Sequence, residues 1–164
     1  MQMNNNVIST EERALPDLNG SALEKTEYHS SSVRETDEIA SRFAKIIKGG
    51  ETILMYGELG AGKTTFTKAL FKALGVTDTV TSPTFTLMKT YYGKYTVHHL
   101  DMYRIETEED VEELGLREEI EGSDVTVIEW NKFTDFIGAV YAVSIEYLGE
   151  NTRKITIALL QKNA

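Results

Sequence analysis

The stretch Gly57-Glu58-Leu59-Gly60-Ala61-Gly62-Lys63-Thr64 decides the fold, because it matches the phosphate-binding template G-x-x-x-x-G-K-[ST] at every fixed position. Its three glycines allow the backbone to turn so tightly that successive amide N–H groups face phosphate oxygens. Lys63 would bring a positive charge to the terminal phosphates, and the Thr64 hydroxyl would bind a magnesium ion. This stretch, called the P-loop below, predicts a nucleoside triphosphate site.

The sequence on either side of the P-loop has the order that the motif requires. The apolar, β-prone run of residues 52–56 comes directly before it. After it, apolar residues recur at helical spacing as far as Leu74, and Gly75 is suited to end that helix. A strand, a loop and a helix in this order place the positive end of the helix dipole at the phosphates.

The composition limits the class of protein and its partners. A chain of 164 residues is expected to form one domain, and the absence of cysteine excludes disulfides and thiolate metal sites. The net charge of −9 argues against a large interface with nucleic-acid phosphates, so any role near RNA is expected to be indirect. The N-terminus has no signal-peptide pattern and no apolar run approaches the ~20 residues of a membrane span, which predicts a cytoplasmic protein.

The chain divides into two regions of different character. Residues 1–27 are polar, mixed in charge and without periodicity, which predicts a flexible N-terminal extension. Residues 28–164 are expected to form a single P-loop domain. This domain should begin with a weak strand over residues 28–33 and a helix with Thr36 as its N-cap.

The predicted elements after the P-loop helix favour an α/β protein. Strands are expected over residues 86–92 and 95–100, joined as a hairpin by Gly93-Lys94, and then over residues 125–130, 141–147 and 154–160. Thr107 is expected to cap a short helix that Gly115 interrupts. The predicted fold is therefore a three-layer P-loop NTPase fold with a mixed, partly antiparallel central sheet.

Residues 105–124 are strongly acidic. A charge run of this kind is typical of a solvated helical face. A docking surface for a partner is the alternative.

Two acidic residues follow predicted strands, where a P-loop protein needs a carboxylate to hold magnesium directly or through water. Glu129 ends one strand and Asp101 ends another, and both would serve, one on the metal and the other orienting water. Ser82 and Thr84 lie where nucleoside triphosphatases often sense the γ-phosphate. Ser-Pro-Thr is also an ordinary turn, so from spacing alone both interpretations stay open.

Three other residues suggest chemistry less strongly. His98 and His99 are adjacent, so in a strand they face opposite sides, which disfavours a histidine metal site. Trp130 is expected to pack in the core, although its place beside Glu129 puts it near the nucleotide.

Five segments together carry a resemblance to a known family. They occur in a fixed order along the chain: GELGAGKTT at 57–65, SPTFTL at 82–87, HLDMYR at 99–104, ELGL at 113–116 and IEW at 128–130. Over residues 30–160 this set resembles the bacterial TsaE family, the ATPase of tRNA threonylcarbamoyladenosine biosynthesis.

The resemblance implies a set of ligands and site residues. It implies ATP rather than GTP, Mg²⁺, and a complex with TsaD-like and TsaB-like proteins through which tRNA is reached only indirectly. It implies nucleotide contacts from the whole P-loop, including Thr65, with Lys63, Asp101 and Glu129 as catalytic residues. The remaining implied roles are magnesium binding by Thr64 and Glu129, an essential acidic role for Asp101, phosphate sensing by Ser82 and Thr84, and positions near the nucleotide for Thr36 and Arg153. The metal role of Asp101 rests on its place at the end of a predicted strand.

The chain departs from the family pattern in two places. One is the long N-terminal extension, and the other is Asn131, where proline commonly follows the Glu-Trp pair.

Three alternatives to an ATPase remain at this point. Asn131-Lys132 and Asp135 resemble the guanine-reading N-K-x-D signature of GTPases, but Asp135 comes one residue too late. A small-molecule kinase would usually carry an arginine-rich lid, whereas the arginines here are scattered. A nucleotide-binding regulatory subunit with negligible catalysis is the third alternative, because only Arg104 offers a candidate arginine finger.

Overall fold

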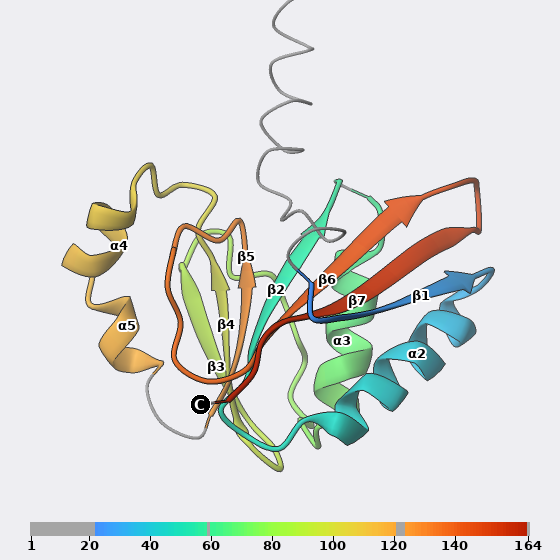
Figure 1. Ribbon diagram of the computed structural model, residues 1–164, viewed down its shortest axis with the longest axis horizontal. Helices are drawn as coiled ribbons and strands as arrows, with labels where there is room; N and C mark the ends of the chain where they lie inside the picture. The colour runs from blue at the N-terminus through green and yellow to red at the C-terminus, as the bar shows by residue number, and fades with distance from the viewer. Residues whose placement is uncertain (1–21, 59, 121–123, 164) are drawn as a thin grey trace, which may run out of the picture.

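The computed structural model describes residues 22–58, 60–120 and 124–163, which form one seven-stranded sheet with helices on both faces (Figure 1). The strand order is β1-β7-β6-β2-β5-β4-β3. The strands are β1 (Glu24–Ser30), β2 (Thr52–Gly57), β3 (Met88–Tyr92), β4 (Thr96–Asp101), β5 (Val125–Glu129), β6 (Val140–Tyr147) and β7 (Arg153–Gln161). The helices are α2 (Val33–Ile46), α3 (Lys63–Ala73), α4 (Glu108–Glu113) and α5 (Leu116–Glu119).

The centre of the sheet is parallel and its margins are antiparallel. Strand β2 pairs in parallel with β5 and β6, and β4 pairs in parallel with β5. Strands β3, β7 and β1 pair antiparallel with β4, β6 and β7 respectively. The predicted mixed, partly antiparallel sheet is confirmed, and the carboxyl ends of β2, β5 and β4 meet at one edge.

Two hydrophobic cores lie on opposite faces of the sheet, as expected for three layers. Helices α2 and α3 cover one face, where Phe43 and Phe66 pack against Ile53 and Met55 of β2. Helices α4 and α5 belong to the other core, to which β2 contributes Leu54. Successive residues of β2 therefore bury alternate faces, which explains why this central strand is continuously apolar.

Helix α2 begins one turn earlier than the sequence analysis predicts. Its N-cap is Ser32, whose Oγ accepts a hydrogen bond from the Glu35 backbone N–H at 3.1 Å. Ser32 and Glu35 have the S-x-x-E spacing of a capping box, which outcompetes the later threonine. The prediction that Thr36 is the N-cap is therefore wrong. Thr36 is buried inside the helix, with its hydroxyl 2.7 Å from the Ser30 Oγ.

Strand β1 lies nearer the N-terminus than the strand predicted over residues 28–33. It pairs antiparallel with β7 along its whole length, from Glu24 opposite Leu159 to Ser30 opposite Arg153. The predicted boundary between extension and domain, at residue 28, falls inside this strand. The remainder of the predicted extension, residues 1–21, lies outside the described residues.

The predicted hairpin forms, but its connection is longer and its glycine has a different role. Tyr92 pairs with Thr96, so the connection has the three residues 93–95 rather than two. Gly93 does not have a left-handed conformation. A Cβ on Gly93 would lie 2.6 Å from the Leu74 carbonyl oxygen, because the hairpin packs directly against the end of α3.

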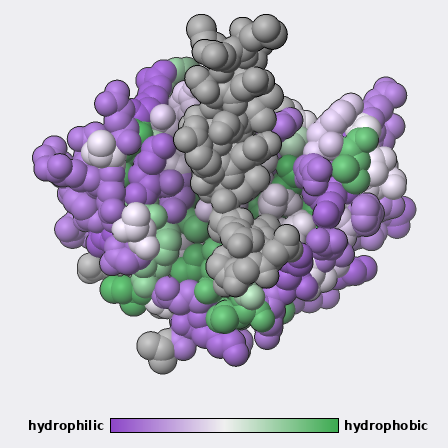
Figure 2. Space-filling model, turned by 45° about the horizontal axis from the view of Figure 1, so that its top comes forward, coloured by the Kyte–Doolittle hydropathy of each residue, from purple (hydrophilic) through white to green (hydrophobic). Residues whose placement is uncertain are grey.

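The acidic region folds as the sequence predicts. Thr107 caps α4, with its hydroxyl accepting a hydrogen bond from the Asp110 backbone N–H at 3.1 Å. Gly115, with a φ of 69°, separates α4 from α5. Figure 2 shows hydrophilic side chains gathered on the side of the molecule where these two helices lie. Among the described helices, none combines the length and apolarity needed to cross a membrane.

We predict that Gly93→Ala destabilises the fold. The new Cβ would overlap backbone atoms of α3's C-terminus, including Leu74, and backbone yields less than a flexible side chain. Overpacking of this kind costs about 1–3 kcal/mol, which urea unfolding would measure. Gly149→Ala is the matched control, because a Cβ at Gly149 meets nothing within 4 Å. Equal stability of the two variants would contradict the prediction.

Candidate functional site

The P-loop joins the end of β2 to the start of α3, and its glycines have the conformations that the template requires. A Cβ on Gly57 would lie 2.7 Å from the Ile145 carbonyl oxygen of the neighbouring strand β6. Gly60 and Gly62 have φ values of +79° and +111°, where a side chain would be strained. Leu59, also expected in the site, lies outside the described residues.

The start of α3 offers several groups to an anion. Gly62 is the N-cap and provides no side-chain cap, and the first turn contains no acidic residue. The helix therefore begins with N–H groups and the positive end of its dipole facing the loop. Lys63 is only 9% exposed, and its Nζ lies 5.1 Å from the centroid of the Trp130 ring. This cation–π contact holds the ammonium group at the site.

Asp101 and Glu129 lie side by side at the P-loop edge of the sheet. Strands β4 and β5 pair so that these two residues are directly opposite each other. In the next strand, β2, Met55 lies opposite Glu129, shortly before Gly57. The structure thus brings both acidic strand ends to the P-loop, as expected from the sequence.

His99 orients the Glu129 carboxylate. The His99 Nε2 lies 2.9 Å from the Glu129 Oε2, and because a carboxylate only accepts, Nε2 carries the shared proton. Nδ1 is buried and has no hydrogen-bond partner among the described residues, and the ring packs edge-on against Phe71. His98, by contrast, points to the other side and contacts Asp124 at 2.9 Å.

The pKa of Glu129 lies below its ordinary value. Burial is the largest single influence and on its own would raise this pKa, because it penalises the charged form. The hydrogen bond and electrostatic attraction from His99, together with the charge of Lys63, outweigh burial and lower the pKa. Glu129 is therefore ionised at neutral pH and available as a ligand for a cation.

Asp101 is occupied by hydrogen bonds from the protein. Its Oδ2 accepts from the Thr84 hydroxyl at 3.1 Å, and its Oδ1 accepts from the Tyr103 backbone N–H at 2.9 Å. The Thr84 and Ser82 hydroxyl oxygens lie 2.6 Å apart. The hydrogen bond between Thr84 and Asp101 therefore connects the segment with Ser82 and Thr84 to the end of β4. An ordinary surface turn would not need this contact.

A cavity of about 580 Å³ joins these groups, and we call it the nucleotide cavity. It brings together most of the residues predicted for the site, and two further aromatic residues. Its lining is Gly60, Gly62, Lys63, Thr64, Thr65, Ser82, Thr84, Asp101, Tyr103, Glu129 and Trp130.

Tyr103 is a lining residue that the sequence did not single out, whereas the place of Trp130 beside Glu129 predicts its position near the nucleotide. Their rings meet edge to face at 4.9 Å, and Trp130 has an unusual φ of 56° that turns the chain immediately after β5. The expectation that Trp130 packs in the core is wrong, because this turn directs it into the nucleotide cavity. For Tyr103 the available signal was its position two residues after the acidic strand end Asp101.

Thr36 and Arg153 lie on the other side of the P-loop. They line a smaller hollow of about 90 Å³ that shares Gly62 and Thr65 with the nucleotide cavity. The Arg153 Nε donates a hydrogen bond to the Ala61 carbonyl at 2.7 Å, so Arg153 supports the loop from outside the larger cavity. Gly57, Glu58 and Ala61 form the loop backbone without lining that cavity.

The oxygen donors of the nucleotide cavity fit Mg²⁺. The Thr64 hydroxyl and the carboxylates of Asp101 and Glu129 are hard oxygen ligands, which this ion prefers. Among the described residues, no group of three or more His, Cys, Asp and Glu side chains could hold a metal. A magnesium ion here would therefore take its remaining ligands from phosphate oxygens and water, as Mg²⁺ usually does.

We predict that His99→Phe makes the protein less stable, and increasingly so as the pH rises from about 3 to 5. In the wild type, the ionised Glu129 stabilises the folded protein at pH values above the unfolded-state pKa of about 4.3. This stabilisation is lost as the pH falls through the lowered pKa of Glu129 in the folded state. Phenylalanine keeps the contact with Phe71 but removes the hydrogen bond, so burial then raises the pKa of Glu129 and makes the ionised carboxylate destabilising.

Urea unfolding of both proteins across this pH range measures the effect. In a Glu129→Gln background, the cost of His99→Phe should not change with pH. A pH-dependent cost that persists in that background would contradict the role of Glu129.

Comparison with known proteins identifies the family. The family described as Threonylcarbamoyl adenosine biosynthesis protein TsaE matches residues 30–155. The crystal structure of Bacillus subtilis YdiB is 30% identical and superposes with a TM-score of 0.68, over 84% of this chain and 87% of that one.

Named TsaE proteins match over most of their length. One from Treponema pallidum is 34% identical over 131 residues, 79% of this chain and 97% of the relative. One from Aquifex aeolicus is 41% identical over 132 residues, 77% of this chain and 90% of the relative. With a P-loop, two acidic strand ends and these matches, the chain belongs to the TsaE family.

Proposed function

We propose that this protein is a Mg²⁺-dependent ATPase in tRNA threonylcarbamoyladenosine biosynthesis, where ATP hydrolysis supports turnover of a complex of TsaD-like and TsaB-like proteins. One observation carries the proposal: a single cavity joins Lys63 and Thr64 of the P-loop to Asp101 and Glu129 of the neighbouring strands. The names of the relatives, tRNA threonylcarbamoyladenosine biosynthesis protein TsaE, supply the pathway.

The P-loop binds the triphosphate. The backbone N–H groups of the loop and of the first turn of α3 face the phosphates, and Lys63 places its ammonium group against the terminal ones. The aromatic contact with Trp130 keeps this ammonium group in place when no phosphate is bound.

Thr64 and Glu129 would hold Mg²⁺, with Asp101 close by. The ion neutralises charge on the β- and γ-phosphate oxygens when it is bound. His99 fixes one oxygen of Glu129, and this leaves the other oxygen, which has no donor among the described residues, for the ion or its water shell.

Asp101 serves mainly to position the segment with Ser82 and Thr84. Both of its oxygens already accept hydrogen bonds from the protein, so it connects this segment to the end of β4. The Ser82 and Thr84 hydroxyls line the cavity, where they would contact the γ-phosphate and report its loss after hydrolysis.

The described lining of the nucleotide cavity contains no obvious arginine finger or histidine base to accelerate hydrolysis. None of its described lining residues is an arginine or a histidine, and Arg104 lies instead over the Phe85 ring, 4.5 Å from its centroid. We therefore expect slow hydrolysis by the protein alone and faster hydrolysis in the complex. The net charge of −9 supports contact with tRNA only through the partners.

The structural roles of the N-K-x-D-like residues disfavour a GTPase. The Asn131 side chain closes its own turn through two 2.9 Å hydrogen bonds with the Phe133 backbone. Asp135 pairs with Arg117 at 3.2 Å. Neither residue lines the nucleotide cavity, so neither is placed to read a guanine base.

We predict that Lys63→Ala weakens ATP binding by at least about tenfold and abolishes the hydrolysis that TsaD-like and TsaB-like proteins stimulate, because a charged donor to the phosphates is lost. Lys68→Ala is the matched control, since Lys68 is exposed on the same helix. Isothermal titration with ATP and GTP, and phosphate release with and without the two partners and tRNA, provide the measurements.

Three results would overturn the proposal. A strong preference for GTP would indicate a GTPase, and transfer of phosphate to a small acceptor would indicate a kinase. Nucleotide binding without hydrolysis, even in the complex, would indicate a regulatory subunit.

We predict that Glu129→Gln lowers Mg²⁺-dependent hydrolysis by at least about tenfold and raises the Mg²⁺ concentration needed for half-maximal rate, because a charged ligand becomes neutral. Binding of ATP without Mg²⁺ should change little. Magnesium titrations of the rate measure this, with Glu146→Gln on the exposed end of β6 as control. An unchanged magnesium dependence would remove Glu129 from the metal site.

A further inference from the structure

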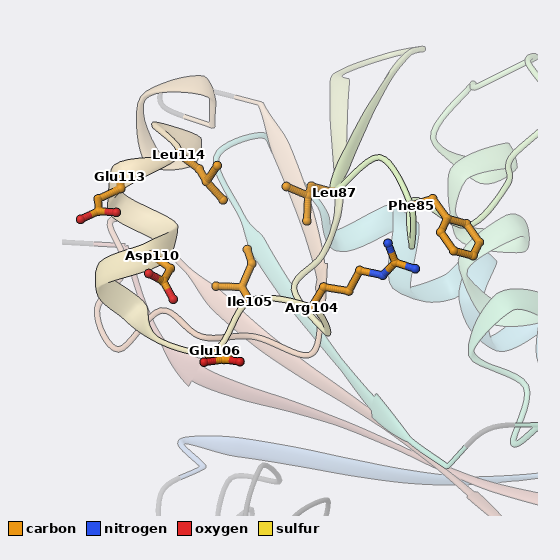
Figure 3. A pocket seen from close by; sticks show the side chains of 8 residues that line it. All are labelled: Phe85, Leu87, Arg104, Ile105, Glu106, Asp110, Glu113 and Leu114. Atoms are coloured by element: carbon orange, nitrogen blue, oxygen red, sulfur yellow. The ribbon is translucent and has the colours of Figure 1, made fainter.

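A second hollow, of about 710 Å³, lies next to the nucleotide cavity without sharing a lining residue with it. It runs between the segment that contains Phe85 and helix α4, and we call it the acidic groove (Figure 3). The proposed catalytic roles use none of its residues.

Part of the acidic groove is apolar and open to solvent. Phe85 is 79% exposed and Leu114 is 53% exposed, and between them lie Leu87 and the buried Ile105. Two large apolar side chains that are exposed to solvent in one groove are typical of a surface that a partner covers.

The wall formed at α4 is negatively charged. Glu106, Asp110 and Glu113 project from it, and among the described residues none of these carboxylates forms an ion pair. The basic residue of the groove, Arg104, points away from them and stacks on Phe85 (Figure 3). The wall therefore offers three uncompensated negative charges beside an apolar surface.

This combination selects one kind of occupant. Phosphates of RNA and anionic lipid head groups would be repelled by the three carboxylates. A protein segment that carries lysine or arginine next to an aliphatic or aromatic side chain matches both the charge and the apolar surface.

The acidic groove is directly connected to the nucleotide cavity through two chain segments. Phe85 follows Thr84, whose hydroxyl donates to Asp101, and Arg104 follows Tyr103, whose N–H donates to the same carboxylate. Leu87 has a strained φ of 66° and its carbonyl accepts from the Asp101 N–H at 2.9 Å. A partner that moves Phe85 or Leu87 therefore also moves the hydroxyls of the nucleotide cavity.

We infer that the acidic groove docks a basic and apolar segment of the partner complex, and that docking there sets the position of Ser82 and Thr84 and so stimulates hydrolysis. This inference rests on the proposed function, and it adds the surface, the chemistry of the segment and the route to the site.

The test reverses the charge of the groove wall in the full-length protein. The triple variant Glu106→Lys, Asp110→Lys and Glu113→Lys should bind the purified TsaD–TsaB complex at least about tenfold more weakly and lose most of the stimulated hydrolysis. The variant should keep the wild-type rate of hydrolysis without partners, since none of the three residues lines the nucleotide cavity.

The matched control reverses three exposed acidic residues of α4 and α5 that do not line the groove, Glu109, Glu118 and Glu119. It makes the same change in net charge and should bind and respond like the wild type. Thermal unfolding and basal hydrolysis of both variants verify that they fold.

The outcomes separate the two proposals. If the wild type is stimulated and both triple variants respond alike, the groove inference is overturned while the proposed function stands. If the groove variant gains affinity for tRNA and keeps its affinity for the TsaD–TsaB complex, the groove faces RNA and the inference is again overturned. If the wild type neither binds nor responds to the TsaD–TsaB complex, both proposals fail.

Discussion

The parallel pairing of β2, β5 and β4 is the constraint on which the site depends. Because the three strands run in one direction and in fixed register, Gly57, Glu129 and Asp101 end at the same edge of the sheet. The P-loop starts with its backbone close to β6, since a Cβ at Gly57 would lie 2.7 Å from the Ile145 carbonyl oxygen. The separation between the groups proposed to bind phosphate and those proposed to bind metal is thus set by the backbone hydrogen bonds of the sheet.

The sequence could predict those parts of the structure that depend on local spacing. The P-loop with its strand and helix, and the two acidic strand ends, follow from residue type and position, because each pattern is complete within a short segment. The pairing of His99 with Glu129 could not be predicted, because it spans 30 residues and requires β4 and β5 to be neighbours. The core packing expected for Trp130 is wrong because the turn after β5 redirects its side chain, and the N-cap predicted for α2 is wrong because two N-caps compete.

The charges of the nucleotide cavity explain why a divalent cation belongs to the proposed mechanism. Its described lining contains one ammonium group, from Lys63, and two carboxylates, from Asp101 and Glu129. A triphosphate would add several negative charges to a partly buried space that is already slightly negative, which is unfavourable at low dielectric. The N–H groups at the start of α3 offset only part of this charge. In the proposed mechanism Mg²⁺ would supply the remainder, and the ionised Glu129 would give it a fixed ligand.

The two carboxylates of the site have different hydrogen-bond partners, and this supports different proposed roles for them. Glu129 has one oxygen held by His99 and keeps the other for a cation, whereas Asp101 has both oxygens bound to Thr84 and Tyr103. A shift of Thr84 would break one of the Asp101 hydrogen bonds in a partly buried place and would therefore carry a free-energy cost. If Thr84 responds to the γ-phosphate as proposed, its hydrogen bond to Asp101 also connects it to the neighbouring surface on which the proposed partner would act.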